Sequence, residues 1–177
     1  MNKMIIGGYK LKIRSARQKD LKALEWDGEY KHFRNVFKQT YQFTKTGNTQ
    51  MWVIEEDREG IIGQVFIQLN GHRKKFANGY DRVYLYSIRI KADFRNLGIG
   101  TYLMKSIQLK MEDHGTRYFT LNVAKENTEA LRFYQRLGYE IQGHDDGKWS
   151  YIDHLGNKRN IAEPSWRMEL DIYRDRS

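Results

Sequence analysis

The chain is organised around Ser87-Ile88-Arg89-Ile90-Lys91-Ala92-Asp93-Phe94-Arg95-Asn96-Leu97-Gly98-Ile99-Gly100-Thr101-Tyr102-Leu103-Met104, which predicts a strand, a tight loop and a helix. Residues 83–90 are rich in β-branched and aromatic side chains, as in a buried strand. Beyond the loop, apolar side chains recur every fourth residue, and Gly115 follows as a helix stop. The apolar positions are Ile99, Leu103, Ile107 and Met111. Gly98 and Gly100 therefore fall in the first turn of a helix.

The first turn of a helix is a favourable place for an anion. Its backbone N–H groups lack intrahelical partners and the helix dipole adds partial positive charge, so a phosphate is stabilised there. Glycine, which has no Cβ, allows such a ligand to come close. A P-loop would need Lys and then Ser or Thr after Gly100, where Thr101 and Tyr102 stand, and a dinucleotide fingerprint would need glycine in place of Leu103. Both of these phosphate loops are excluded.

Two motifs resemble those of one enzyme family. Arg95-x-x-Gly98-x-Gly100, after Ile88-x-Ile90, resembles the pyrophosphate-binding motif of the GNAT superfamily of acetyl-CoA-dependent N-acetyltransferases. The family's other signature resembles Leu121-x-Val123-x-x-x-Asn127-x-x-Ala130-x-x-Phe133-Tyr134-x-x-x-Gly138-Tyr139. Together the two motifs cover about the middle third of the chain and agree with the family continuously.

Length and composition are those of one globular domain, and we expect residues 1–177 to form a single GNAT domain. The chain has no cysteine, which excludes a disulfide framework, a thiolate nucleophile and a Cys-based zinc site. Without a signal peptide or a long apolar run, we expect a cytoplasmic protein with no membrane partner and no metal cofactor. The net charge of +9 suits a polyanion such as coenzyme A. The basic residues 72–75 read as a solvated loop, so we expect no nucleic-acid partner.

The rest of the pattern is similar to the GNAT fold, an α/β (α+β) architecture with a mixed, mostly antiparallel sheet of about six to seven strands flanked by about four helices. We predict helices over 18–26, 30–41, 99–114 and 127–137, and strands over 9–17, 50–56, 61–69, 83–90, 118–123, 139–141, 149–153 and 166–170. Residues 143–165 are more than that fold requires. We expect most of the three aromatic residues Trp149, Tyr151 and Trp166 to cover the sheet, the alternative being that they wall the acceptor pocket.

The resemblance implies where acetyl-CoA binds. Backbone groups of Ile88, Arg89 and Ile90 would pair with its pantetheine arm and acetyl carbonyl, as an added strand pairs with a sheet edge. The pyrophosphate would accept N–H bonds from the loop made of Asn96, Leu97, Gly98, Ile99, Gly100 and Thr101. Arg95 would add a charge-assisted contact or brace that loop. Asn127 would cap its helix and bond to the cofactor, or to Tyr134 through water.

Tyr134 is the predicted catalytic residue. A phenol held within hydrogen-bond reach can protonate the coenzyme A thiolate that is expelled when an amine attacks the thioester. The alternative for a tyrosine on an apolar helix face is a purely structural role in the core.

The general base is less well defined. GNAT enzymes that acetylate the N-termini of ribosomal proteins use a glutamate at the position of Asn122, which cannot take a proton. The remaining candidates are acids, one histidine or a relayed water: Glu25, Asp27, Glu29, Glu126 and His32. The acids of the turn, Glu25, Asp27 and Glu29, could also hold a cationic amine or complement helix ends.

The predicted function is transfer of an acetyl group from acetyl-CoA to a primary amine of a small molecule or protein, by direct attack in a ternary complex. The partners are then acetyl-CoA and the amine, and a homodimer is a common assembly for this architecture. The alternative is a non-catalytic acyl-CoA-binding or nucleic-acid- or ribosome-associated module of the same fold.

Overall fold

The computed structural model describes residues 3–174. Within them lie ten strands, three α-helices and four short 3-10 turns, η1 to η4. The strands are β1 (Met4–Ile6), β2 (Tyr9–Ser15), β3 (Thr49–Glu56), β4 (Gly60–Gln68), β5 (Arg82–Ile90), β6 (Tyr118–Ala124), β7 (Glu140–Asp145), β8 (Lys148–Ile152), β9 (Lys158–Ala162) and β10 (Ser165–Asp171). The helical elements are η1 (Gln18–Asp20), η2 (Ala23–Gly28), η3 (Lys31–Phe33), α1 (Arg34–Thr44), η4 (Ala92–Phe94), α2 (Ile99–Glu112) and α3 (Thr128–Arg136).

Eight strands form one sheet in the order β1-β2-β3-β4-β5-β6-β10-β7, and β8 pairs with β9 in a separate hairpin. All neighbours in the sheet are antiparallel except β5 and β6. The predicted mixed, mostly antiparallel sheet is confirmed, but the predicted strand number was too low. The strand β1 is a three-residue edge, too short to show a period, and β9 is mostly exposed and lacks apolar alternation.

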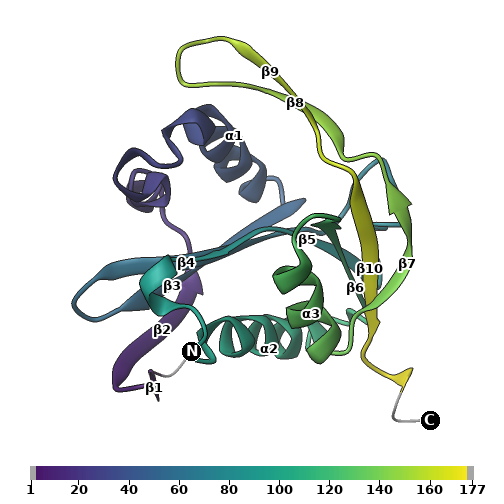
Figure 1. The fold of residues 1–177 in the computed structure, drawn as a ribbon, viewed down its shortest axis with the longest axis horizontal. Helices are drawn as coiled ribbons and strands as arrows, with labels where there is room; N and C mark the ends of the chain where they lie inside the picture. The colour runs from purple at the N-terminus through teal and green to yellow at the C-terminus, as the bar shows by residue number, and fades with distance from the viewer. Residues whose placement is uncertain (1–2, 175–177) are drawn as a thin grey trace.

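Helices cover both faces of the sheet. α1 lies on one face, and α2 and α3 lie on the other (Figure 1). Phe37 of α1 packs with Met51 and Phe66 in the smaller core cluster, whereas the larger cluster joins the sheet to α2 and α3 through residues such as Leu103 and Phe119. No helix within residues 3–174 is long and apolar enough to cross a membrane.

The predicted helix over residues 18–26 is wrong, because η1 and η2 replace it and Trp26 and Asp27 have φ angles of 44° and 55°. The bend is held by a local and a long-range contact of Trp26: its ring packs edge-on against Tyr30, with ring centroids 5.2 Å apart, and the guanidinium of Arg89 on β5 lies 5.7 Å from it. The helix predicted from Tyr30 starts later, at Arg34, after the short turn η3. Apolar spacing alone does not distinguish these turns from helices.

β5 and β6 separate soon after they meet. They pair only over Arg82–Tyr84 and Tyr118–Thr120, after which β5 follows β4 alone. The register of β5 against β4 shifts, and Ser87, with φ 52°, lies in the irregular part of β5, as expected of a bulge. A strand edge that β6 does not cover therefore runs to Ile90, with α3 beside the gap (Figure 1).

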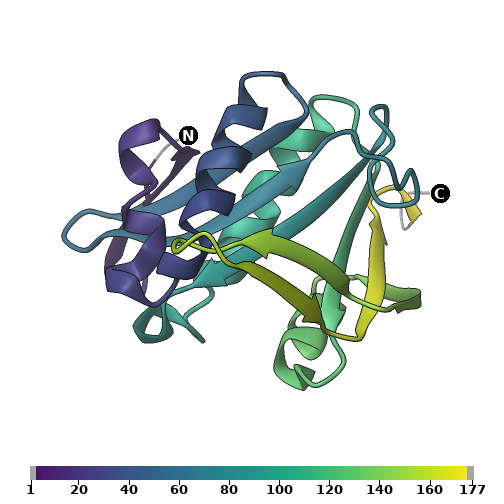
Figure 2. The same cartoon turned by 90° about the horizontal axis from the view of Figure 1, so that it is seen from above.

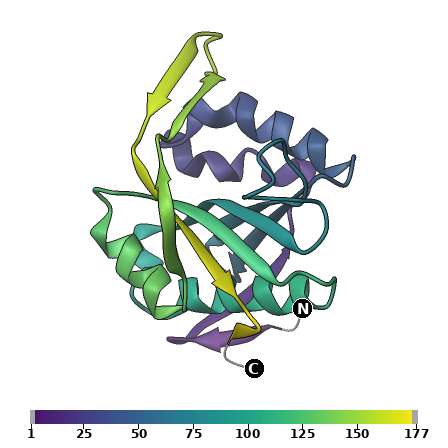
Figure 3. The same cartoon turned by 90° about the vertical axis from the view of Figure 1, so that its right-hand side faces the viewer.

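The β8–β9 hairpin leaves the sheet and arches over the α1 side (Figure 2 and Figure 3). Trp149, which is 44% exposed, stacks with Tyr151 at 5.1 Å and with Phe33 at 6.1 Å. Asn35 of α1 donates to the backbone oxygen of Asp153 at 2.7 Å. The expectation that Trp149 and Tyr151 cover the sheet is therefore wrong, because they pack against η3.

Trp166, by contrast, lies in β10 against the larger core cluster. The basic loop 72–75 lies between β4 and β5, as predicted, and Arg73 pairs there with Asp145.

Candidate active site

The predicted phosphate loop begins α2 as expected. Gly98 is the N-cap residue, with φ 84° and ψ 0°, a conformation that L side chains rarely adopt. A Cβ at Gly98 would meet no protein atom within 4 Å, so the space above the residue is open. The N–H of Tyr102 donates to the Gly98 carbonyl at 3.0 Å, and by helix geometry the N–H groups of the preceding turn have no intrahelical acceptor. An anion can therefore approach the backbone N–H groups of the loop closely.

Gly100 has a different role in the fold. A Cβ at this position would lie 3.3 Å from Cζ of Phe133 on α3, a tighter approach than most Cβ contacts. The absence of a side chain therefore lets α2 pack against α3. Of the two motif glycines, only Gly98 opens toward the space a ligand would use.

Arg95 braces the loop, because its Nε donates to the carbonyl oxygen of Ile90 at 2.8 Å. The bond ties the loop to the end of β5, next to Asn96 with φ 59° and the exposed Leu97. Ile88, Arg89 and Ile90 lie on the part of β5 that has lost β6 as a neighbour. Backbone groups on that edge are available to an extended, amide-containing ligand such as pantetheine, so the residues present fit acetyl-CoA.

Tyr134 projects from α3 into the larger core cluster and is 8% exposed. Its ring packs 5.1 Å from Phe133 and 5.8 Å from Tyr139, and within residues 3–174 its hydroxyl forms no hydrogen bond. Burial, and to a smaller degree Tyr84, raises the pKa of Tyr134 above its usual value. Tyr134 belongs to α3, which lies beside the gap between β5 and β6 (Figure 1). The phenol is protonated at neutral pH.

Asn127 caps α3, and its Oδ1 accepts the N–H of Ala130 at 3.0 Å. Asn122 of β6 carries a buried Oδ1 that accepts no hydrogen bond within residues 3–174.

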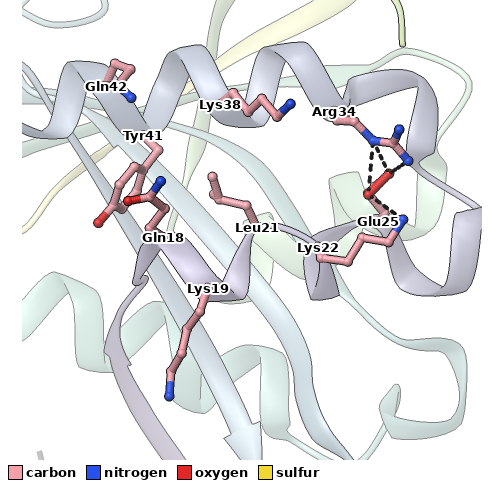
Figure 4. A pocket seen from close by; sticks show the side chains of 9 residues that line it. All are labelled: Gln18, Lys19, Leu21, Lys22, Glu25, Arg34, Lys38, Tyr41 and Gln42. Atoms are coloured by element: carbon pink, nitrogen blue, oxygen red, sulfur yellow. Dashed lines mark hydrogen bonds and ion pairs between the residues drawn. The ribbon is translucent and has the colours of Figure 1, made fainter.

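The three acids of the predicted turn have different surroundings. Glu25 is 2% exposed and pairs with Arg34 at 2.7 Å and with Lys22 at 3.1 Å. Glu25, Arg34 and Lys22 line a groove of about 570 Å³ between η1–η2 and α1 (Figure 4). Neither Tyr134 nor the phosphate loop lines that groove. Asp27 and Glu29 are exposed, and within residues 3–174 neither forms an ion pair.

The sequence reasoning assigned a role to the backbone of Arg89 but none to its side chain, and it did not identify Arg167. The guanidinium of Arg89 lies 3.7 Å from the ring centroid of Tyr30, within a cage completed by Phe37 at 5.5 Å, Trp26 at 5.7 Å and Phe33 at 5.8 Å. Arg167 of β10 lies directly opposite Asn122 in the sheet. For Arg167, its period-2 alternation with the core residue Met168 was the available signal.

His32 adjoins the same region. Its ring lies 4.2 Å from that of Phe33 and 6.3 Å from that of Tyr151. Burial lowers the pKa of His32, and so do the positive charges of Arg89, His154 and Arg159. His32 is therefore largely neutral at pH 7 and able to accept a proton.

Comparison with known proteins identifies the family. The profile of the Acetyltransferase (GNAT) family matches residues 15–139, and the chain belongs to this family. It is an acyltransferase of the N-acetyltransferase type, and acetyl-CoA is the acyl donor that this family uses.

Two curated relatives and one solved structure illustrate the likeness. The chain is 25% identical over 150 residues to the N-terminal acetyltransferase A complex catalytic subunit ard1 of Schizosaccharomyces pombe, covering 80% of this chain and 83% of that protein. It is 29% identical over 127 residues to the 5-NmdU N-acetyltransferase of Pseudomonas phage PaMx11, covering 67% and 86%. The spermidine/spermine N-acetyltransferase SpeG from Vibrio cholerae shares the fold, with TM-score 0.68, 17% identity and coverage of 94% and 96%.

Proposed function

We propose that this protein transfers the acetyl group of acetyl-CoA to a primary amine by direct attack in a ternary complex, with Tyr134 as the general acid. The observation that carries the proposal is the position of Tyr134 on α3, the helix beside the gap between β5 and β6 (Figure 1), with a protonated hydroxyl that has no protein partner within residues 3–174. Its oxygen is not among the fully buried side-chain atoms that lack a hydrogen-bond partner, so it is open to a bound molecule.

The cofactor assignment follows from the loop and the strand edge. The N–H groups of the loop from Asn96 to Thr101, with the open space at Gly98, would hold the pyrophosphate, and the β5 edge from Ile88 to Ile90 would hold the pantetheine arm. In this assignment Arg95 braces the loop, as its bond to the Ile90 carbonyl suggests. Asn127 caps α3 and so holds Tyr134 at the gap.

The proposed reaction balances in one displacement. The amine nitrogen forms a bond to the acetyl carbon, the carbon–sulfur bond breaks, and the sulfur takes the proton of Tyr134. The nitrogen loses a proton as the amide forms, and that proton restores the phenol. Burial raises the pKa of Tyr134, which keeps the proton on the phenol until the thiolate appears. The thiolate is expelled next to the same apolar surroundings, where its own basicity also rises, so the transfer remains feasible.

A base must remove the proton from the attacking ammonium, because an ordinary alkyl amine is protonated at pH 7. Among the candidates, His32 has the most support: its pKa is lowered and it adjoins Phe33, Tyr151 and Arg89. Glu25 is already neutralised by two cations, and Glu126 is exposed. Asp27 and Glu29 are exposed as well and could attract an amine from solvent.

The rest of the predicted organisation is retained as part of the proposal. β1, β7 and β10 lie outside the matched residues but belong to the same sheet, which supports a single domain over residues 1–177. A cytoplasmic location, supported by the absence of cysteine, and a homodimer stay predictions.

Two measurements test the proposal. Acetyl-CoA should raise the melting temperature of the protein, and a panel of primary amines should release free thiol from acetyl-CoA. The panel includes a peptide with a free N-terminus and an aminomethyl pyrimidine nucleoside, because ard1 is named as an N-terminal acetyltransferase and the phage relative as acting on 5-NmdU. Binding of acetyl-CoA without thiol release from any amine would favour the non-catalytic module.

A further inference from the structure

The groove between η1–η2 and α1 has no part in the proposed reaction. Its volume is about 570 Å³, which lies within the range of about 300 to 1,000 Å³ that is typical of small-molecule sites. Neither Tyr134 nor any residue of the loop from Asn96 to Thr101 lines the groove. It is therefore a second place at which this chain can hold a small molecule.

The lining of the groove carries an excess of positive charge. It includes one carboxylate, that of Glu25, and four cations, which are Lys19, Lys22, Arg34 and Lys38. The net charge of these side chains is +3. Within residues 3–174, neither Lys19 nor Lys38 forms an ion pair. Like charges that share a groove repel one another, and a bound anion relieves that repulsion.

Glu25 does not make the groove a site for a cation. Its side chain is 2% exposed, and its carboxylate pairs with Arg34 at 2.7 Å and with Lys22 at 3.1 Å. A buried carboxylate that already has two cationic partners gains little from a third. An ammonium ligand is therefore disfavoured in the groove, and an anion is favoured.

The charged end of the groove has hydrogen-bond donors that Glu25 does not use. The carboxylate of Glu25 contacts Nε and one terminal nitrogen of Arg34, which leaves other N–H groups of the guanidinium free of it. The Lys38 side chain extends from α1 toward the Arg34 end of the groove (Figure 4). Guanidinium and ammonium groups bind phosphate oxygens in charge-assisted hydrogen bonds, so this end is suited to phosphate groups.

The opposite end of the groove is neutral. Gln18, Tyr41 and Gln42 lie there, and Leu21 lies between them and the charged end (Figure 4). In the part of the chain that the structure describes, residues 3–174, neither glutamine side chain forms a hydrogen bond. An aromatic ring offers a stacking surface to a planar base, and a side-chain amide offers a donor and an acceptor to the edge of the base. This end is therefore suited to a nucleobase.

We propose that the groove binds a nucleoside polyphosphate, with the phosphates at the Arg34 end and the base at the Tyr41 end. The two parts of such a ligand match the charged and the neutral side chains along the groove. The inference goes beyond the transferase reaction and does not depend on it, because the groove shares no lining residue with the loop at the start of α2 and does not include Tyr134.

Calorimetry of the full chain with ATP tests the inference, both without and with an excess of coenzyme A. We expect ATP to bind under both conditions, because coenzyme A would occupy a different site. Adenosine and inorganic triphosphate each supply one part of the ligand and should bind weaker than ATP by about tenfold or more. Equal affinities of triphosphate and ATP would refute the placement of a base at the Tyr41 end.

Lys38 is the position to vary, because it is exposed and has no partner within residues 3–174, so its replacement should leave folding intact. Lys38→Gln should weaken ATP binding by about threefold, and Lys38→Glu by about tenfold or more, since the new carboxylate repels the phosphates. Lys10→Gln and Lys10→Glu make the same changes of charge at an exposed position of β2 and should alter the affinity by less than about twofold. Melting temperatures identify any variant that is misfolded.

Several results would overturn the inference. The groove does not bind the nucleotide if ATP fails to bind to the wild type, or if Lys38→Glu and Lys10→Glu weaken binding equally. ATP that is displaced by coenzyme A and is insensitive to Lys38→Glu occupies the cofactor site instead. A single-stranded oligonucleotide that binds more tightly than ATP by about tenfold or more, and is lost in Lys38→Glu, would assign the groove to nucleic acid.

Discussion

Replacing Tyr134 with phenylalanine separates catalysis from packing at this site. The ring contacts with Phe133 and Tyr139 survive the substitution, and within residues 3–174 no hydrogen bond is lost, since the hydroxyl forms none. We therefore expect the free energy of unfolding to change by less than about 1 kcal/mol. Acetyl-CoA affinity should also be preserved, because the loop at Gly98 and the β5 edge are untouched.

The expected loss in turnover is much larger. A positioned general acid contributes about 10²- to 10⁴-fold, which corresponds to about 3 to 5 kcal/mol of activation free energy. Thiol release at saturating amine measures kcat, and the acetyl-CoA-dependent melting temperature measures binding. Unchanged kcat in Tyr134→Phe with every acceptor would refute the acid role.

Tyr139 provides a matched control. It is a second buried tyrosine whose pKa is raised, but its hydroxyl accepts a hydrogen bond from Nε2 of Gln108 at 3.2 Å. Tyr139→Phe should therefore cost about 0.5 to 1.5 kcal/mol of unfolding free energy and leave kcat unchanged. The two variants are expected to show opposite effects, one on turnover and one on stability. Equal effects on turnover would mean that general loss of packing, and not proton donation, explains Tyr134→Phe.

Three further predictions follow from individual positions. Gly98→Val places a branched side chain in the space open to phosphate at a φ of 84°, so acetyl-CoA should bind at least tenfold more weakly, about 1.4 kcal/mol by calorimetry; unaltered affinity would contradict the loop assignment. Asp153 has its pKa lowered to about 2, so it stabilises the folded state above its unfolded value of about 4, and that stabilisation is lost as pH falls through about 2. The midpoint of urea unfolding of Asp153→Asn should lack this pH dependence. If the midpoints of the variant and the wild type changed with pH in the same way, the stabilising role of Asp153 would be refuted. Because the pKa of His32 is lowered, kcat/KM should stay constant down to a pH below 6.5 and fall only in more acidic solution. In His32→Gln this fall of kcat/KM at acidic pH should be absent; a pH profile identical to that of the wild type would exclude His32 as the base.

Local sequence determined the central part of the protein. The strand to Ile90, the loop at Gly98, the helix α2 and the Asn127 cap depend on interactions within a few residues of one another. Glycine at a positive φ, a capping side chain and apolar periodicity are properties of a short segment, so they can be read without the rest of the chain. The family motifs lie in these segments, which is why the fold class and the family were also predictable.

Tertiary structure alone decided which side chains meet on the α1 face of the sheet. The contacts on this face join residues that are far apart in the sequence. The separations, taken as differences of residue numbers, are 59 for Arg89 and Tyr30, 116 for Trp149 and Phe33, and 45 for Arg167 and Asn122. Contacts at such separations depend on strand order and register, which local periodicity does not specify. The same holds for Gly100, whose lack of a side chain is required by Phe133 on another helix. Short-range backbone preferences thus determined the glycine loop at the start of α2, whereas the packing of distant segments determined the surroundings of the Arg89 and Trp149 side chains.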